Sequence, residues 1–357
     1  MDSSISSSNF SSENTTGFAL VGVASHHHEF VAEAVKRTQN TSLVGVYDRD
    51  EALGRKIAQK FGTEYFNSLE QLLAIPGVTV GVVTSENALK KELAIRLARA
   101  GKHVICDKPL GLSAKDSREI IEECRKSNVR LQVGFVSRYT TEAQRTKQFI
   151  ASGKLGKIKL ILGENRVDSG LVKQLSPWLL KKDLAGGGAM MEHSVHALDL
   201  ALWYNSGAKP ESAYAVAGEN LDSSYEGEDN FSIMVRFSNG CVATVDGSYS
   251  RPSSGRSGDI VMRIVGERGE LVMSSSSLEF KEHVGEEPST EIKTYSRSLG
   301  STSEAPAGEL MVRDMLECIK TGREPLAGGR EGELVNCIVD AGYESLKLGR
   351  EVGVQFS

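Results

Sequence analysis

The sequence predicts an α/β protein in which a doubly wound parallel sheet is followed by an α+β domain with a large, mainly antiparallel sheet. From Gly17 to about residue 138, short apolar, β-branched runs alternate with helix-length segments, as in parallel sheets that are covered on both faces. Beyond about residue 150, strand-like runs are joined by turn sequences at 238–240 and 267–269, which is typical of hairpins. The 357 residues suffice for two such domains.

The elements of the first domain are predicted from hydrophobic period and run length. Helices are expected where apolar residues recur at helical spacing, and strands where apolar runs are short. The expected strands are 18–23, 43–48, 78–84, 103–107 and 130–136. The expected helices are 29–39, 51–60, 68–74, 88–100 and 113–126.

The second domain, residues 139–357, is expected to bind substrate and to support oligomerisation. Two closing helices, 306–321 and 331–348, are placed to pack back on the first domain, residues 17–138. The expected strands are 157–167, 212–221, 229–237, 241–250, 258–266 and 269–275.

Composition excludes several classes of protein. Residues 1–16 are rich in Ser, Thr and Asn without a basic or apolar region, which predicts a disordered tail and not a signal peptide. The sequence contains no run of about 18 apolar residues, so no membrane-spanning helix is expected. The net charge of −5 without a long basic run argues against nucleic acid as a partner. Five scattered cysteines without C-x-x-C spacing favour a reducing cytoplasm.

The turn after the first strand indicates a nucleotide site. Residues 22–27 read GVASHH, where a Rossmann dinucleotide-binding unit has G-x-G-x-x-G to bring the backbone and a helix N-terminus to the pyrophosphate. Only the first glycine remains, so a bare strand–turn–helix explains the segment almost as well. The residues expected to hold the cofactor in this turn are Gly22, Ala24, Ser25, His26 and His27.

The three histidines 26–28 also raise the question of a metal site. Adjacent residues on a turn that enters a helix point in different directions, and no distant Cys, His or Asp cluster is spaced to complete a ligand shell. No metal is therefore expected. His27 replaces the third glycine, so its imidazole should either donate to a cofactor phosphate or shift the helix outward.

The end of the second strand suggests which cofactor binds. Asp48 follows Gly22 by 26 residues, and a carboxylate there can accept hydrogen bonds from the ribose hydroxyls of NAD and repel the 2′-phosphate of NADP. Arg49 could stack on adenine or pair with that phosphate, so NADP stays open. In the alternative interpretation, Asp48 merely caps a turn.

Two later segments suggest an active site. Residues 101–113, GKHVICDKPLGLS, place Lys108 and Pro109 at the carboxyl end of a predicted parallel strand, where open α/β sheets bind ligands. Residues 186–204, GGGAMMEHSVHALDLALWY, place Glu192, His196 and Asp199 on one helical face. A solvated lysine and a structural histidine are the alternatives.

With these motifs, the chain from Gly17 onward resembles the Gfo/Idh/MocA oxidoreductases, the family of glucose–fructose oxidoreductase and inositol dehydrogenase. The supporting segments are AGKHVICDKP (100–109), VGFVSRY (133–139), SGKLGKI (152–158), the motif at 186–203 and DAGYESLKLGREVGV (340–354). The resemblance implies that Asp107-Lys108-Pro109 replaces a Glu-Lys-Pro motif beside the nicotinamide. It also implies that His196 is the proton acceptor, assisted by Lys108 and Glu192.

This chemistry suits alcohol oxidation, because a positioned imidazole removes the hydroxyl proton as hydride leaves carbon, and a lysine can hold the developing alkoxide. The sequence departs from the family at two places. Glu192 replaces an aspartate, and SENALK (85–90) replaces T-P-N-x-x-H. Ser85 and Asn87 remain expected cofactor contacts, and Glu86 is expected unusually near the ribose.

Further site residues are expected by position. Arg138 and Tyr139 follow the last strand of the first domain, where cofactor contact and domain packing are equally expected. Arg166, Glu192 and His193 are expected to contact substrate together with Lys108 and His196. One or two of Asp168, Trp178, Lys181 and Lys182 are expected to do the same.

The sequence thus predicts an NAD(P)-dependent dehydrogenase that oxidises a secondary alcohol of a sugar, polyol or inositol, or reduces the ketone. One alternative is a glycosidase or sugar–sugar oxidoreductase with tightly bound NAD. The other is a non-catalytic nucleotide-sensing regulator. A homodimer or homotetramer is expected, because an antiparallel sheet with one covered face leaves the other for a partner subunit.

Overall fold

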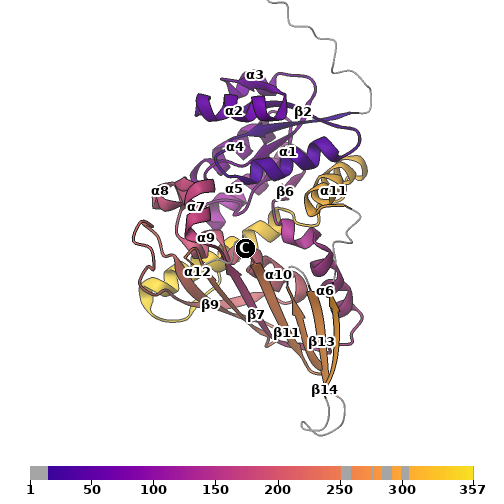
Figure 1. The fold of residues 1–357 in the computed structure, drawn as a ribbon, viewed down its shortest axis with the longest axis vertical. Helices are drawn as coiled ribbons and strands as arrows, with labels where there is room; N and C mark the ends of the chain where they lie inside the picture. The colour runs from indigo at the N-terminus through magenta and orange to yellow at the C-terminus, as the bar shows by residue number, and fades with distance from the viewer. Residues whose placement is uncertain (1–14, 251–258, 275–276, 284–291, 299–304, 357) are drawn as a thin grey trace, which may run out of the picture.

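The structure, a computed structural model, describes residues 15–250, 259–274, 277–283, 292–298 and 305–356. It consists of an N-terminal domain stacked on a second domain that is dominated by one large sheet (Figure 1). The expected tail, residues 1–16, lies outside the described residues apart from Thr15 and Thr16, and Thr16 already belongs to the first strand.

The first domain is a six-stranded parallel sheet in the order β3-β2-β1-β4-β5-β6, which confirms the predicted doubly wound fold. The short strand β3 was not expected. The strands are β1 (Thr16–Val21), β2 (Thr41–Tyr47), β3 (Glu64–Phe66), β4 (Val78–Val83), β5 (His103–Cys106) and β6 (Leu131–Val133). The helices between them are α1 (His27–Arg37), α2 (Glu51–Phe61), α3 (Leu69–Leu73), α4 (Asn87–Arg99) and α5 (Ala114–Lys126).

Local signals fix the ends of these helices. Asp50 and Ser113 cap α2 and α5 by accepting hydrogen bonds from the amides of Leu53 and Asp116, and α2 ends at Gly62 in the left-handed region. The helix α1 differs, because its N-cap residue His26 makes no side-chain cap, and the His27 amide donates only a long, 3.4 Å hydrogen bond to the Ser25 hydroxyl. Its N-terminus points toward the carboxyl edge of the sheet.

The second domain is built on a nine-stranded sheet in the order β14-β13-β12-β11-β7-β10-β9-β8-β15. Of the neighbouring strands in it, β7 and β10 run parallel and the other pairs run antiparallel, so the predicted mainly antiparallel sheet is confirmed. Strands β13, β14 and β15 were not expected. The strands are β7 (Ile158–Arg166), β8 (Pro210–Val216), β9 (Asn230–Phe237), β10 (Val242–Ser248), β11 (Asp259–Gly266), β12 (Gly269–Met273), β13 (Ser277–His283), β14 (Ile292–Ser298) and β15 (Val352–Gly353).

Helices cover one face of this sheet and join it to the first domain. α10 packs on β7, β10 and β11, and α12 contacts both α5 and β8. α11 packs beside α1, as Figure 1 shows. Among the described residues, no helix is both long and apolar enough to span a membrane. The remaining helices are η1 (Val136–Tyr139), α6 (Thr141–Ala151), α7 (Ser169–Leu175), η2 (Pro177–Leu180), α8 (Lys182–Ala185), α9 (Ala189–Glu192), α10 (Ser194–Tyr204), α11 (Ala307–Thr321) and α12 (Gly329–Leu348).

The expected single helix across residues 186–204 is wrong. It is broken at His193, which separates α9 from α10. The glycines before it are required by close packing, because a Cβ on Gly188 would lie 2.0 Å from the carbonyl oxygen of Glu228. Because of this break, Glu192 lies on α9, whereas His196 and Asp199 lie on α10, where Asp199 pairs with Arg138.

Candidate active site

A cavity of about 250 Å³ lies where the carboxyl edge of the parallel sheet meets the second domain. This is the edge at which open α/β sheets bind ligands. Seven residues expected at the site line it, and they come from α1, the β5 end, α9 and α10. They are Ser25, His26, His27, Lys108, Glu192, His193 and His196.

Lys108 and Glu192 form a buried ion pair in this cavity. The lysine is 2% exposed and the glutamate 4%. The Nζ of Lys108 contacts Oε1 of Glu192 and donates a second hydrogen bond of 3.0 Å to the Glu192 backbone carbonyl. One of the three ammonium hydrogens is thus left for a ligand.

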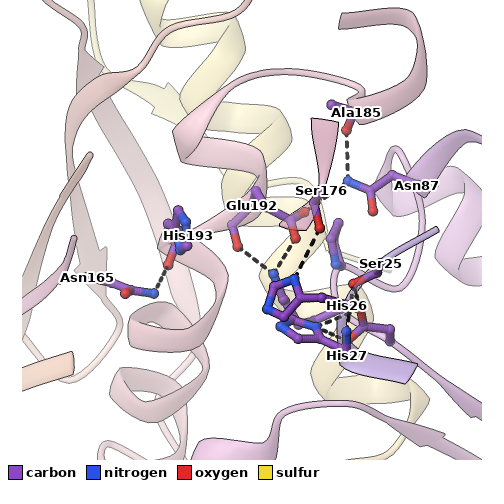
Figure 2. A network of polar contacts seen from close by, with 12 residues as sticks. Ser25, His26, His27, Asn87, Asn165, Ser176, Ala185, Glu192 and His193 are labelled. Carbon is purple, nitrogen blue, oxygen red and sulfur yellow. Dashed lines mark hydrogen bonds and ion pairs between the residues drawn. The ribbon is translucent and has the colours of Figure 1, made fainter. Parts of the chain in front are cut away.

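Asn87 holds the other oxygen of this glutamate. Its Nδ2 donates to Oε2 of Glu192 at 3.1 Å and to the carbonyl oxygen of Ala185 at 2.9 Å, as Figure 2 shows. Among the described residues its Oδ1 is buried without a hydrogen-bond partner, and the expected cofactor contact of Asn87 stays a prediction. The longer side chain of Glu192, compared with aspartate, reaches both Lys108 and Asn87.

His196 and His193 are neutral imidazoles in this environment. Burial, followed by the charge of Lys108, lowers the pKa of each well below its ordinary value. In the described part of the chain, the Nδ1 atoms of both rings are buried without a hydrogen-bond partner. A neutral His196 can accept a proton, as a general base must.

The histidines of the nucleotide turn connect three segments. His27 Nδ1 lies 2.9 Å from Oδ2 of Asp107 at the end of β5. His26 Nδ1 lies 3.1 Å from the Ser176 hydroxyl of the second domain, a contact that Figure 2 shows. Burial would raise the pKa of Asp107, but the charges of His27 and Lys90 outweigh it and lower that pKa. Burial also lowers the pKa of His26 to about 4.

The turn itself fits a dinucleotide. Gly22 has φ +76°, and a Cβ there would lie 2.5 Å from Cβ of Ser85, so this position requires glycine. Asp48 is 8% exposed and accepts hydrogen bonds from the amides of Val23 at 2.6 Å and Asp50 at 2.8 Å. Asp48 therefore stabilises the turn, in agreement with the alternative interpretation that it caps the turn. Each carboxylate oxygen still has a lone pair that could accept a hydrogen bond from a ribose hydroxyl.

A second cavity of about 230 Å³ adjoins the first, between α1 and α11. His26, His27, Val136 and His196 line both cavities. The other residues of the second cavity include Thr84, Asp107 and Gly134 at the strand ends and Val82, Ile105 and Met311 deeper in the fold. Together the two cavities extend from the nucleotide turn to His196.

Three predicted arginine contacts are not brought into either cavity. Arg138 is buried and forms a bidentate ion pair with Asp199. Its Nε donates to Oδ2 at 2.8 Å and its Nη2 donates to Oδ1 at 2.7 Å. Arg166 pairs with Asp246 on the outer face of the sheet. Successive side chains of a strand point to opposite faces, and the neighbouring Asn165 points to the inner face. Arg49 pairs with Glu92 at the surface. In the structure these arginines form ion pairs within the protein, and their expected contacts with cofactor or substrate stay predictions.

The weaker candidates are also engaged elsewhere. Asp168 caps α7 through the amides of Gly170 and Leu171, and Lys181 pairs with Glu226. Tyr139 donates to Asp314. Trp178 lies near the site, because its Nε1 donates to the Ala24 carbonyl at 3.2 Å.

Three polar residues near the site were missed by the sequence analysis. Asn165 lines the first cavity and donates to the His193 carbonyl at 2.9 Å. Ser176 approaches His26 from the second domain. Lys90 is fully buried behind Lys108 and donates to the carbonyl oxygens of Lys108 and Pro109. Alternate residues of β7 point to the inner face of the sheet, and this alternation could have revealed Asn165. The contact of His26 with Ser176 joins residues far apart in the sequence, so no local sequence pattern predicts it.

The residues around the cavity do not form a metal shell. Within the residues that the structure describes, no group of three or more His, Cys, Asp or Glu side chains could hold a metal ion. The five cysteines are free and buried.

A dinucleotide turn beside a buried lysine–carboxylate pair and a neutral histidine defines an oxidoreductase-type site. Comparison with models of known protein families supports the same class of protein. Residues 16–135 match the oxidoreductase family's NAD-binding Rossmann fold, and residues 143–272 match the GFO/IDH/MocA C-terminal domain. The chain therefore belongs to the Gfo/Idh/MocA family of oxidoreductases, as the sequence resemblance predicted.

Individual relatives are distant. Levoglucosan dehydrogenase of Pseudarthrobacter phenanthrenivorans is 26% identical over 251 residues, which cover 64% of each chain. Myo-inositol 2-dehydrogenase of Thermotoga maritima is 25% identical over 331 residues, which cover 91% of this chain and 94% of the relative. A solved structure of levoglucosan dehydrogenase with NADH has a TM-score of 0.83 at 22% identity, covering 96% of this chain and all of the other. That likeness shows the shared fold.

Proposed function

We propose that this protein is an NAD-dependent dehydrogenase that oxidises a secondary alcohol of a sugar, polyol or inositol, or reduces the corresponding ketone. The observation that carries the proposal is the convergence of neutral His196 and the Lys108–Glu192 pair on one cavity at the edge of the dinucleotide domain. The named relatives act on levoglucosan and myo-inositol, which supports a hydroxyl-rich substrate.

His196 would act as the general base. Its lowered pKa keeps the imidazole neutral at pH 7, so it can accept the hydroxyl proton. A positioned base of this kind contributes roughly 10²–10⁴-fold to the rate.

Lys108 would hold the substrate oxygen as negative charge develops on it. Two of its ammonium hydrogens are fixed by Glu192, and Asn87 fixes Glu192 in turn. The remaining hydrogen is pre-oriented and loses little freedom when a ligand binds, which is the condition for electrostatic stabilisation of a transition state.

The nicotinamide, when bound, supplies the hydride acceptor. Gly22 and the N-terminus of α1 would hold the pyrophosphate, and Asp48 would accept hydrogen bonds from the ribose. Asp48 and nearby Glu86 place negative charge where NADP carries its 2′-phosphate, so we expect NAD to be preferred.

A second candidate function is hydride exchange between sugars on a retained cofactor. Ser176 and Trp178 reach from the second domain onto residues 24–26 of the nucleotide turn, which would slow release of a dinucleotide. Aldose–aldose oxidoreductase from Caulobacter crescentus, crystallised with glycerol, shares this fold with a TM-score of 0.81.

Mixing the protein with free NAD⁺ and a panel of sugars, polyols and inositols tests both candidates. Net formation of reduced nicotinamide supports the dehydrogenase. Sugar turnover without net nicotinamide reduction supports exchange on retained cofactor. If Lys108→Ala and His196→Ala leave the biological activity unchanged, a nucleotide-sensing regulator replaces both.

We also propose a homodimer or homotetramer that works in the reducing cytoplasm. The outer face of the large sheet exposes Leu162, Tyr214, Val216 and Met234, and covering such side chains favours association. The free, buried cysteines suit a reducing compartment.

A further inference from the structure

The first cavity is lined by two unlike groups of side chains. The polar group surrounds the catalytic candidates Lys108, Glu192 and His196 together with Asn165. The apolar group comes from the end of β7, from α7 and η2, and from the start of β11. It comprises Val167, Leu171, Val172, Leu175, Leu179 and Ile260.

The described lining carries little free positive charge. Its one lysine, Lys108, is matched by Glu192, and burial holds His193 and His196 neutral by lowering the pKa of each. His27 faces the carboxylate of Asp107. A phosphate or carboxylate group would therefore be desolvated here without a compensating cation, which is costly.

Three neighbouring cations in the described part of the chain are engaged outside the cavity. Arg138 is paired with Asp199 and Arg166 with Asp246, and Lys173 on α7 is paired with Asp222. Moving any of them into the cavity would break an existing ion pair.

We propose that the site selects a small, uncharged sugar derivative with an apolar edge, such as a deoxy, anhydro or O-methyl sugar, and rejects sugar phosphates and sugar acids. This inference rests on the proposed dehydrogenase function. The apolar group of side chains would strip water from a hydroxyl without replacing its hydrogen bonds, but would gain from burying a methyl group. A cavity of about 250 Å³ is small for a ligand site, since typical sites span about 300–1,000 Å³.

Matched sugar series test the proposal. D-glucose, 6-deoxy-D-glucose, methyl D-glucoside and D-glucose 6-phosphate, with the corresponding galactose series, would be compared by kcat/KM with NAD⁺. In the active series we expect at least one apolar analogue to exceed its parent about tenfold, the lower end of what one methylene contributes in an apolar pocket. We expect the phosphate to fall at least about tenfold below the parent. A preferred phosphate, or a parent better than every apolar analogue, would overturn the proposal.

Variants of the apolar group link the preference to the cavity. Leu171→Asn and Leu175→Asn should reduce the advantage of the apolar analogue to about threefold or less. Leu175 is already 37% exposed, so its replacement should not prevent folding. Leu221→Asn, at a leucine that is 72% exposed and outside the cavity, is the control and should leave the ratio unchanged. A ratio that both cavity variants leave intact would contradict the proposal.

Direct binding separates this inference from the reaction. Calorimetry of the NADH-loaded protein with the same sugars would show apolar analogues binding more tightly than their parents even if none is oxidised. Such binding without turnover would support the inference and reject the dehydrogenase. Equal or tighter binding of the phosphates, or binding of none of the sugars, would reject the inference.

Discussion

The ammonium group of Lys90 donates a 2.6 Å hydrogen bond to the backbone carbonyl of Lys108, from a side chain that is fully buried on α4. A second bond of 3.2 Å reaches the carbonyl of Pro109. Lys90 therefore fixes the backbone of the segment from which Lys108 extends toward Glu192. It is a positioning residue, since it does not line the cavity.

Replacing Lys90 with methionine should lower kcat by about tenfold or more and change KM less, because Lys108 would lose its fixed backbone while substrate contacts stay. Lys91→Met is the matched control. Lys91 is the next residue and pairs with Asp116 and Glu119 at the surface, so its loss should leave kcat unchanged. Equal kcat values for wild type and Lys90→Met would contradict the positioning role.

Lys90 should also affect stability at alkaline pH. Burial lowers its pKa below 10.5, so the unfolded chain binds more protons than the folded one between the lowered pKa and 10.5. The free energy of unfolding should therefore rise with pH across that window. Urea unfolding at several pH values should show a smaller rise for Lys90→Met than for Lys91→Met. Identical slopes would argue against a buried titrating lysine.

Breaking the Lys108–Glu192 pair should cost both stability and activity. Lys108→Met or Glu192→Leu alone leaves one buried charge unmatched, which typically costs about 3–5 kcal/mol. The double variant should recover most of this unfolding free energy but no activity. Thermal unfolding and kcat, measured on all three, test this; a double variant as unstable as the single ones would show that the ion pair is not the dominant contact.

The pH dependence of kcat/KM for alcohol oxidation should report His196. Because burial lowers its pKa, the base form persists at neutral pH, and activity should fall only as pH drops through a value below 6.5. His196→Ala should lose about 10²–10⁴-fold in kcat and should lose that acid limb. His103→Ala is the control, since His103 accepts from the Arg130 amide far from the cavity. An unchanged acid limb in His196→Ala would assign it to another group.

The His27–Asp107 pair should influence NAD affinity through charge. His27→Gly restores the glycine of the nucleotide turn but leaves the Asp107 carboxylate with the Ser25 hydroxyl and without its imidazole partner, near the expected pyrophosphate. We expect NAD to bind about tenfold more weakly, and the additional change Asp107→Asn to recover part of this loss. Fluorescence titration of the two variants and the wild type measures it. Unchanged affinity in His27→Gly would show that the imidazole merely fills space.

Much of the fold could be predicted because its signals are local. The alternation of β1, α1 and β2 follows from short apolar runs and helical spacing, and hairpins such as β9–β10 follow from turn residues between strands. The break at His193 could not be predicted, since it arises from packing of α9 against β9 and β10 and not from a helix-breaking residue.

The site was predictable only in part. Lys108, Glu192 and His196 were found because their motifs are distinctive, and the structure brings all three to one cavity. Arg138 and Arg166 were expected there because they lie at strand ends. In the structure they form ion pairs with Asp199 and Asp246, because a buried or partly buried guanidinium requires a charged partner. Lys90 stands at the histidine position of T-P-N-x-x-H, but its role was missed because its partners are backbone carbonyls 18 and 19 residues away.

The central claim is that a hydroxyl-rich substrate is oxidised at the cavity shared by Lys108 and His196. Rapid mixing of the NAD-loaded protein with sugars, polyols and inositols, followed by absorbance of the reduced nicotinamide, tests it most directly. We predict reduction with at least one of them in the wild type, and reduction at least about 100-fold slower in His196→Ala. The absence of reduction with every compound, or equal rates in wild type and His196→Ala, would contradict the account.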